Sequence, residues 1–125
     1  MDLTRMQKRE LMWLASVAEE DGTIRYQDLF ERKGSLGGSS LEDFGYRYDA
    51  LEAAGFVDSR CRSWEDPVAA VRLTEEGREM AELCLQEELN DPLLSDETRK
   101  GVKGAFISQG VAVAIKALLS SVGFA

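Results

Sequence analysis

The chain has 125 residues, which is enough for about one domain with a single modest core. Its composition, 44% hydrophobic and 30% charged, is typical of a soluble globular protein and excludes intrinsic disorder. The absence of histidine and the presence of only two cysteines exclude the usual zinc sites. A polar N-terminus unlike a secretory leader, together with isolated thiols, predicts a cytoplasmic location.

The formal net charge of −8 is distributed unevenly along the chain. Residues 63–91 contain nine acids but only Arg72 and Arg78 as bases, whereas residues 92–125 carry a small excess of bases. A net negative protein repels polyanions at long range. Because the acids are concentrated in one segment, the charge weakens the case for a nucleic-acid partner without excluding one.

The first half of the chain contains signals for three helices. Thr4 and Gln7 form a capping box that predicts a helix to about Glu20, with an apolar stripe that includes Leu11 and Leu14. The turn at Asp21-Gly22 precedes a short strand at 23–25 and a short helix at 26–32. A Gly/Ser-rich connection at 34–40 then leads into a third helix, which begins at residue 39 or 40 and stops at residue 55.

The second half begins with a predicted β-ribbon. Residues 56–62 and 68–73 alternate as two strands around a turn at 63–67, and Thr74 begins a fourth helix that runs to about Leu89. Asn90-Asp91-Pro92 ends that helix. Ser95 is expected to begin a short helix through about residue 102, and Ser108 a last helix over 109–122.

This order predicts a mainly α fold with a small antiparallel β-wing, a winged helix-turn-helix with extra C-terminal helices. Two motifs resemble the MarR and PadR types of transcription regulator: the helix stop LEAAGFV at 51–57 and the return LTEEG at 73–77. The resemblance covers roughly residues 4–89. It implies a winged-helix domain at 1–91 and a helical extension at 92–125, used for core packing or dimerisation.

The resemblance also implies a double-stranded DNA partner. The third helix would then enter the major groove while the wing contacts the backbone. The candidate DNA-binding residues are Ser40, Tyr46, Arg47, Arg60, Arg62, Arg25, Arg32 and Lys33. Against this interpretation, the outward face of the third helix also carries Glu42, Asp43, Asp49 and Glu52, which would repel phosphate.

A second hypothesis therefore stands beside DNA binding. On this hypothesis the arginines form surface ion pairs with the abundant acids. The protein would then be a winged-helix adaptor whose acidic third and fourth helices bind a basic protein. Trp64, in the wing turn, is either folded back on the core or an exposed anchor for a partner.

The C-terminal segment is the least charged part of the chain. Its apolar residues recur at roughly heptad spacing and predict a homodimer interface formed by Ile107, Val111, Ile115, Leu118 and Val122. Packing within the chain's own core is the alternative, and a membrane tail is disfavoured because Lys116 interrupts a short apolar stretch. The tail also resembles, more weakly, an uncharacterised winged-helix family of phages and prophages.

The sequence contains no catalytic constellation. It has no histidine to act as a base, no G-x-S-x-G and no phosphate-binding loop after a strand. Cys61 lies between Arg60 and Arg62, which supports redox sensing at most. The acids of the fourth helix lack the turn geometry of a calcium loop. We therefore expect no enzymatic activity, no cofactor and no metal.

Overall fold

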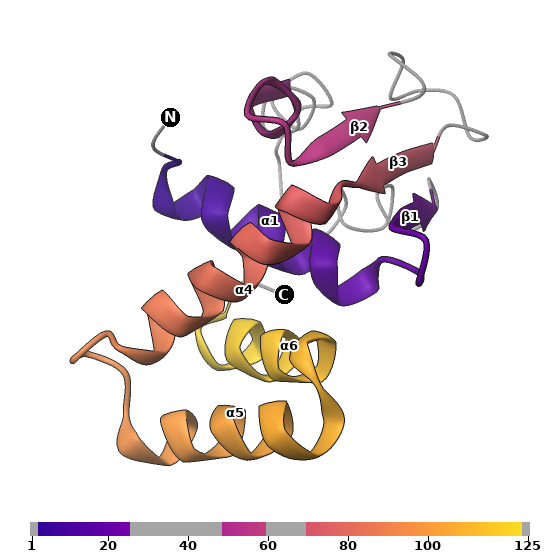
Figure 1. Ribbon diagram of the computed structural model, residues 1–125. Coiled ribbons are helices and arrows are strands. Elements are labelled where there is room, and N and C mark those ends of the chain that lie inside the picture. The colour runs from indigo at the N-terminus through magenta and orange to yellow at the C-terminus, as the bar shows by residue number, and fades with distance from the viewer. Residues whose placement is uncertain (1–2, 26–48, 60–69, 124–125) are drawn as a thin grey trace.

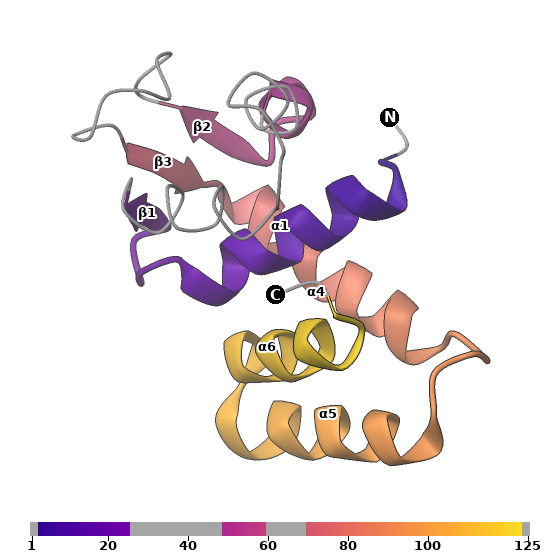
Figure 2. The same cartoon turned by 180° about the vertical axis from the view of Figure 1, so that it is seen from behind.

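A computed structural model describes residues 3–25, 49–59 and 70–123. The described elements are α1 (Arg5–Val17), β1 (Thr23–Arg25), β2 (Val57–Ser59), β3 (Ala70–Leu73), α4 (Glu75–Leu89), α5 (Asp96–Gln109) and α6 (Val111–Ser121). The sheet lies at one end and the α5–α6 hairpin at the other, with α1 and α4 between them (Figures 1 and 2). The protein is therefore mainly helical with a small antiparallel sheet, as predicted.

Helix α1 begins where the capping box predicts. The Thr4 hydroxyl accepts a hydrogen bond from the Gln7 amide, and the Gln7 side chain accepts one from the Thr4 amide. The helix ends at Val17, earlier than predicted, because Ala18 adopts an extended conformation. This change of direction lets the Glu19 amide donate to the Thr23 carbonyl and carries the chain directly into β1.

The sheet has the strand order β1-β3-β2, and both pairings are antiparallel. Val57, Val71 and Leu73 are buried, whereas Asp58 and Arg72 are exposed. This alternation is the period-2 pattern of a sheet with one face on the core. The three predicted strands are confirmed within the described residues; the predicted turn at 63–67 lies outside them.

The two motifs LEAAGFV and LTEEG meet in space. Residues 49–53 are helical, and Gly55 (φ 84°) ends the helix: the Phe56 amide donates to the Leu51 carbonyl and the Gly55 amide to the Glu52 carbonyl. These two bonds form a Schellman motif. The Thr74 hydroxyl donates to the Gly55 carbonyl over 2.7 Å, so the stop of one helix is fixed to the start of α4.

Gly77 explains why the second motif ends in glycine. A Cβ at this position would overlap the Phe56 carbonyl oxygen and lie 2.8 Å from Leu73 Cδ1. The Thr74 hydroxyl accepts a hydrogen bond from the Gly77 amide and caps α4 as predicted. Close approach of α4 to the Gly55–Phe56 turn therefore requires a residue without a side chain. We call this contact between 51–56 and 73–77 the helix–ribbon junction.

The C-terminal helices differ from the prediction in where they break. Ser95 caps α5 as expected, but the helix continues to Gln109 instead of ending near residue 102. Gly110, at φ 99° and ψ 179°, separates α5 from α6. Ser108 does not cap the last helix; its hydroxyl donates to the Gly104 carbonyl inside α5. The prediction of a helix starting at Ser108 was wrong because the backbone reversal needs the glycine.

One hydrophobic core joins the two ends of the chain. Buried side chains of α1, the sheet and α4 form a single cluster with Val102 of α5 and Ile115 and Leu118 of α6. Helix α6 packs against both α1 and α5. The segment 92–125 therefore contributes to the same core as residues 3–91. Within the described ranges, the helices are too short or too polar to cross a membrane.

Candidate functional site

Most of the residues predicted to contact DNA lie outside the described ranges. These are Ser40, Tyr46, Arg47, Arg32 and Lys33, and also Arg60 and Arg62 of the ribbon. Cys61 and Trp64 lie outside them too. The backbone of Arg25 is described: it belongs to β1 and pairs with Ala70 of β3. The structure therefore describes only the parts that border the predicted interface, namely the helix end at 49–53, the sheet and the junction between them.

The parts that border the predicted interface carry both charges. At the helix end, Asp49 and Glu52 are exposed. On the exposed face of the sheet, Arg72 lies opposite Asp58, and its Nε donates to the Asp21 carbonyl over 3.2 Å. The Thr23 amide donates to the Asp21 carboxylate and holds the pKa of Asp21 below its ordinary value. Acidic side chains lie beside Arg72 at this edge of the sheet, so the described residues do not form a phosphate-binding site.

The arginines whose side chains are described all make hydrogen bonds within the chain. Arg78 donates to the carbonyls of Glu19 and Glu20, which fastens the turn after α1 to α4. Arg99 donates to the carbonyls of Leu89, Asp91 and Leu94 and so caps the C-terminal end of α4. It also forms an ion pair with Asp96. Arg5 and Arg9 pair with acids of α4. Positive charge for DNA would therefore have to come mainly from the predicted set.

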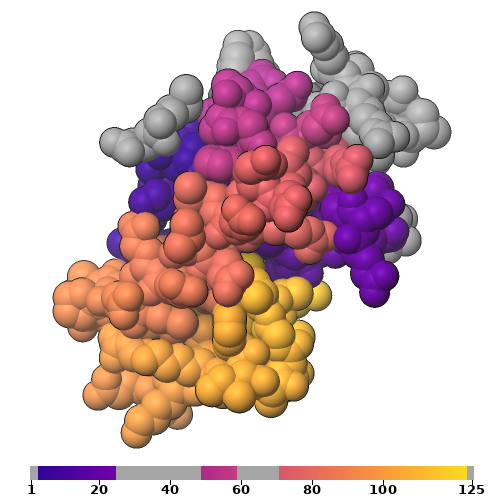
Figure 3. Space-filling view, in the orientation of Figure 1, coloured from indigo at the N-terminus to yellow at the C-terminus, as the bar shows by residue number. Residues whose placement is uncertain are grey.

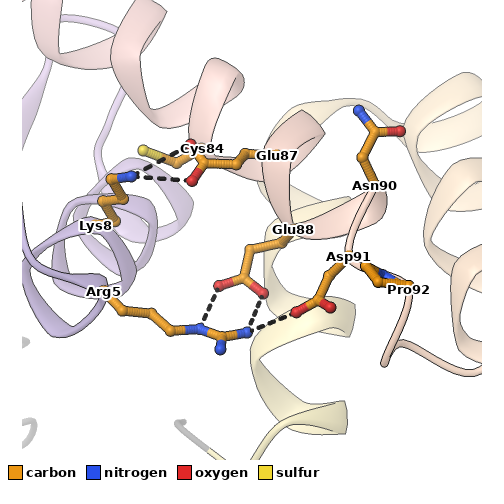
Figure 4. Close-up of a pocket in the computed structure, with 8 residues that line it drawn as sticks. All are labelled: Arg5, Lys8, Cys84, Glu87, Glu88, Asn90, Asp91 and Pro92. Atoms are coloured by element: carbon orange, nitrogen blue, oxygen red, sulfur yellow. Dashed lines mark hydrogen bonds and ion pairs between the residues drawn. The ribbon is translucent and has the colours of Figure 1, made fainter.

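The most developed side-chain cluster joins α1 to the end of α4 (Figure 4). Arg5 binds Glu88 through two hydrogen bonds of 3.4 and 3.2 Å and reaches Asp91 at 3.1 Å. Arg9 adds a 3.2 Å bond to Glu88, and Lys8 pairs with Glu87 at 3.0 Å. We call these six residues the α1–α4 ion cluster. It neutralises the C-terminal half of the acidic helix.

The pKa values follow from this geometry. Burial raises the pKa of Glu88, but the hydrogen bonds and charges of Arg5 and Arg9 outweigh it, so the net shift is downward. The Leu93 amide and Arg5 likewise lower the pKa of Asp91. The Glu88 hydrogen bond raises the pKa of Arg5. Each of these three shifts favours the charged form of its group, so Arg5, Glu88 and Asp91 join α1 to the end of α4 as ions.

A groove of about 460 Å³ lies along this cluster, lined by Arg5, Lys8, Cys84, Glu87, Glu88, Asn90, Asp91 and Pro92. Its acids and bases already satisfy one another, so they are not free to act on a substrate. Cys84 contributes the one thiol in this lining. Among the described residues, no group of carboxylates and thiols could hold a metal ion.

Burial makes the Cys84 thiol unreactive. Loss of solvent around the thiolate raises the pKa of Cys84 to about 11, and the side chain is almost fully buried. Because the thiolate is the nucleophile, we expect iodoacetamide at pH 8 to leave Cys84 unlabelled in the folded protein and to label it in urea. Peptide mass spectrometry checks this. Labelling of Cys84 at the unfolded rate without denaturant would contradict the packing of α4 on α1.

The predicted dimerisation residues do not lie on one face. Ile107 belongs to α5 and is 85% exposed, whereas Ile115 and Leu118 of α6 are fully buried in the chain's own core. Val111 and Val122 are partly buried. The heptad pattern placed Ile107 in line with the residues of the last helix, but Ile107 belongs to α5, which Gly110 separates from α6. Of the five, Ile107 has the most surface for contact with a second chain.

Acids without a described partner remain on the N-terminal half of α4. Glu75, Glu76 and Glu79 are exposed, and the junction places the first two beside the helix end that carries Glu52.

Comparisons with known protein families, curated proteins and solved structures find no match for this chain. The geometry of the described residues is therefore the basis on which a function can be proposed.

Proposed function

We propose that this protein is a small winged-helix DNA-binding protein that acts as a dimeric transcriptional regulator, with an origin in a phage or prophage. The observation that carries the proposal is the helix–ribbon junction. A helix ends at Gly55, and β2 begins two residues later. β2 pairs with β3, and β3 leads into α4, whose cap residue Thr74 donates a hydrogen bond to the Gly55 carbonyl. A helix and ribbon fixed in this way would form one surface on a duplex.

The strand order supports the same proposal. β1 pairs with β3 on the side opposite β2, and residues 26–48 link β1 to the described helix end at 49–53. The sequence predicts one helix at 26–32 and another that begins at residue 39 or 40, and the described end of the latter is residues 49–53. In the proposed complex, Ser40, Tyr46 and Arg47 read the major groove, since base edges are recognised by hydrogen-bonding side chains.

Phosphate contacts are assigned to the ribbon and its surroundings. Arg60 and Arg62 follow Asp58 by two and four residues, and Asp58 lies on the exposed face of β2. Arg25, Arg32 and Lys33 supply further positive charge in the proposed complex. Internal hydrogen bonds occupy the arginines whose side chains are described, which favours assigning the phosphates to this set.

The proposal predicts salt-sensitive binding that depends on Arg47. Fluorescence anisotropy with mixed-sequence duplex DNA at low salt should show binding that weakens steadily as salt rises. Arg47→Ala should weaken binding several-fold and reduce the slope of affinity against salt by about 1, because one cation would no longer face the duplex. Lys116→Ala is the control: Lys116 is exposed on α6, so its removal should have little effect. Equal effects of the two variants would contradict the assigned interface.

An adaptor that binds a basic protein is the second candidate. It is favoured by the acids Glu75, Glu76 and Glu79, which have no described partner and lie on the helix that starts beside Glu52. The same titration separates the two functions. If the folded protein gives no signal with DNA at low salt but binds a lysine-rich peptide, and Glu76→Lys removes that binding, the adaptor replaces the regulator.

A further inference from the structure

An apolar groove lies between α4 and α5, remote from the junction. It has a volume of about 240 Å³ and is lined by Leu85, Gln86, Leu89, Lys103, Phe106 and Ile107. Helices α4 and α5 diverge from the turn at 90–95, and both reach the face of the molecule shown in Figure 3. At the edge of the groove, Ile107 is 85% exposed although it borders an apolar floor.

The two walls of the groove have opposite charge. On α4, Glu79 and Glu82 precede Gln86 by seven and four residues and so lie on the same side of the helix. On α5, Lys100 and Lys103 precede Ile107 by the same intervals. Asp96, at the start of α5, is already paired with Arg99. One wall is therefore acidic and the other basic, with apolar residues between them.

Such a groove is complementary to itself. A two-fold axis that runs along the groove brings the acidic wall of one chain onto the basic wall of the other and places each Ile107 over the partner's apolar floor. An acidic or a basic partner would satisfy only one wall. We propose that this groove is a homodimer interface whose occupant is α4 and α5 of a second copy of this chain.

This interface differs from the heptad stripe expected from sequence. Ile115 and Leu118 cannot take part because they are buried within one chain. The proposal rests on the proposed dimeric regulator and names the surface by which it would dimerise. It is tested without DNA, so dimerisation through this groove and DNA binding can fail separately. The residues that would form the interface all belong to described elements: Glu79, Glu82, Leu85, Gln86, Leu89, Lys100, Lys103, Phe106 and Ile107.

The test is the mass of the full chain by sedimentation equilibrium over a range of concentrations. The wild type should approach twice the 13.9 kDa of one chain. Ile107→Asp should raise the dimer dissociation constant at least about tenfold, because a charge would be buried against the floor. Leu93→Asp is the matched control: Leu93 is 89% exposed in the turn after α4, so its change should leave the mass unaltered.

Charge reversal tests the pairing of the walls. Glu82→Lys alone and Lys103→Glu alone should each weaken the dimer, and the double variant should restore it, because both copies then carry exchanged walls. Circular dichroism verifies that each variant is folded. A wild type that stays monomeric at high concentration, or a dimer that Ile107→Asp does not weaken, would overturn the proposal.

Discussion

Gly77→Ala is expected to destabilise the protein by about 3 kcal/mol or more. The added methyl group would overlap the Phe56 carbonyl oxygen, which is backbone and cannot rotate away. Relief would require α4 to move from the Gly55–Phe56 turn, breaking the hydrogen bonds that Thr74 makes to that turn. Urea unfolding followed by circular dichroism measures the loss.

Gly101→Ala is the matched control. Gly101 also lies in a helix, but a Cβ there would meet open space. Alanine is a better helix former than glycine, so this change should stabilise the protein by up to about 1 kcal/mol. If Gly77→Ala proved as well tolerated as Gly101→Ala, the close packing at the helix–ribbon junction would be wrong.

Glu88→Gln is expected to cost about 2 kcal/mol. Glu88 accepts from both Arg5 and Arg9, and its side chain is only 10% exposed. The neutral amide would leave two guanidinium groups facing it without a compensating charge. The matched control, Glu87→Gln, removes an acid whose side chain is 66% exposed, so less than about 0.5 kcal/mol should be lost.

The same cluster predicts the acid dependence of stability. The pKa of Glu88 in the folded chain is lower than its ordinary value, so the carboxylate contributes stability at every pH above that ordinary value. This contribution is lost as the pH falls below about 4.5 toward the folded pKa. Urea unfolding at a series of pH values should show a shallower acid decline in Glu88→Gln than in the wild type. Parallel curves would contradict the pairing of Glu88 with Arg5 and Arg9.

Local signals correctly predicted where α1, α4 and α5 begin, whereas Ser108 was wrongly expected to begin the last helix. Thr4, Thr74 and Ser95 each cap a helix through a hydrogen bond to an amide three residues ahead, and such bonds depend only on neighbouring residues. The alternation of 56–59 and 70–73 likewise predicted paired strands. The helix stop at Gly55 and the helix cap at Thr74 were also predicted correctly, although the contact between them could not be seen in the sequence.

The helix ends were harder to predict, because tertiary pairing decides them. Helix α1 stops at Val17 so that residue 19 can pair with residue 23. Two glycines, 101 and 104, lie inside α5 and do not interrupt it, whereas Gly110 does because its φ is positive. A sequence pattern does not tell these glycines apart.

The α1–α4 ion cluster and the apolar groove were missed for a related reason. Arg5 and Glu88 are separated by 83 positions, and nothing local links them. The sequence pattern treated the acids of the fourth helix as one candidate surface for a basic protein, but packing on α1 divides them into a neutralised half and an exposed half. Glu10 is also fully buried although it carries a carboxyl group, a placement that only the packing of α1 reveals.

Amide chemical-shift mapping tests most directly whether the helix and ribbon joined at Gly55 form a DNA-binding surface. Isotope-labelled protein would be titrated with a mixed-sequence duplex at low salt. We expect shifts concentrated at residues 40–47 and 60–62, with residues 111–121 of α6 unchanged. Absence of shifts, or shifts confined to α5 and α6, would contradict DNA binding through this surface.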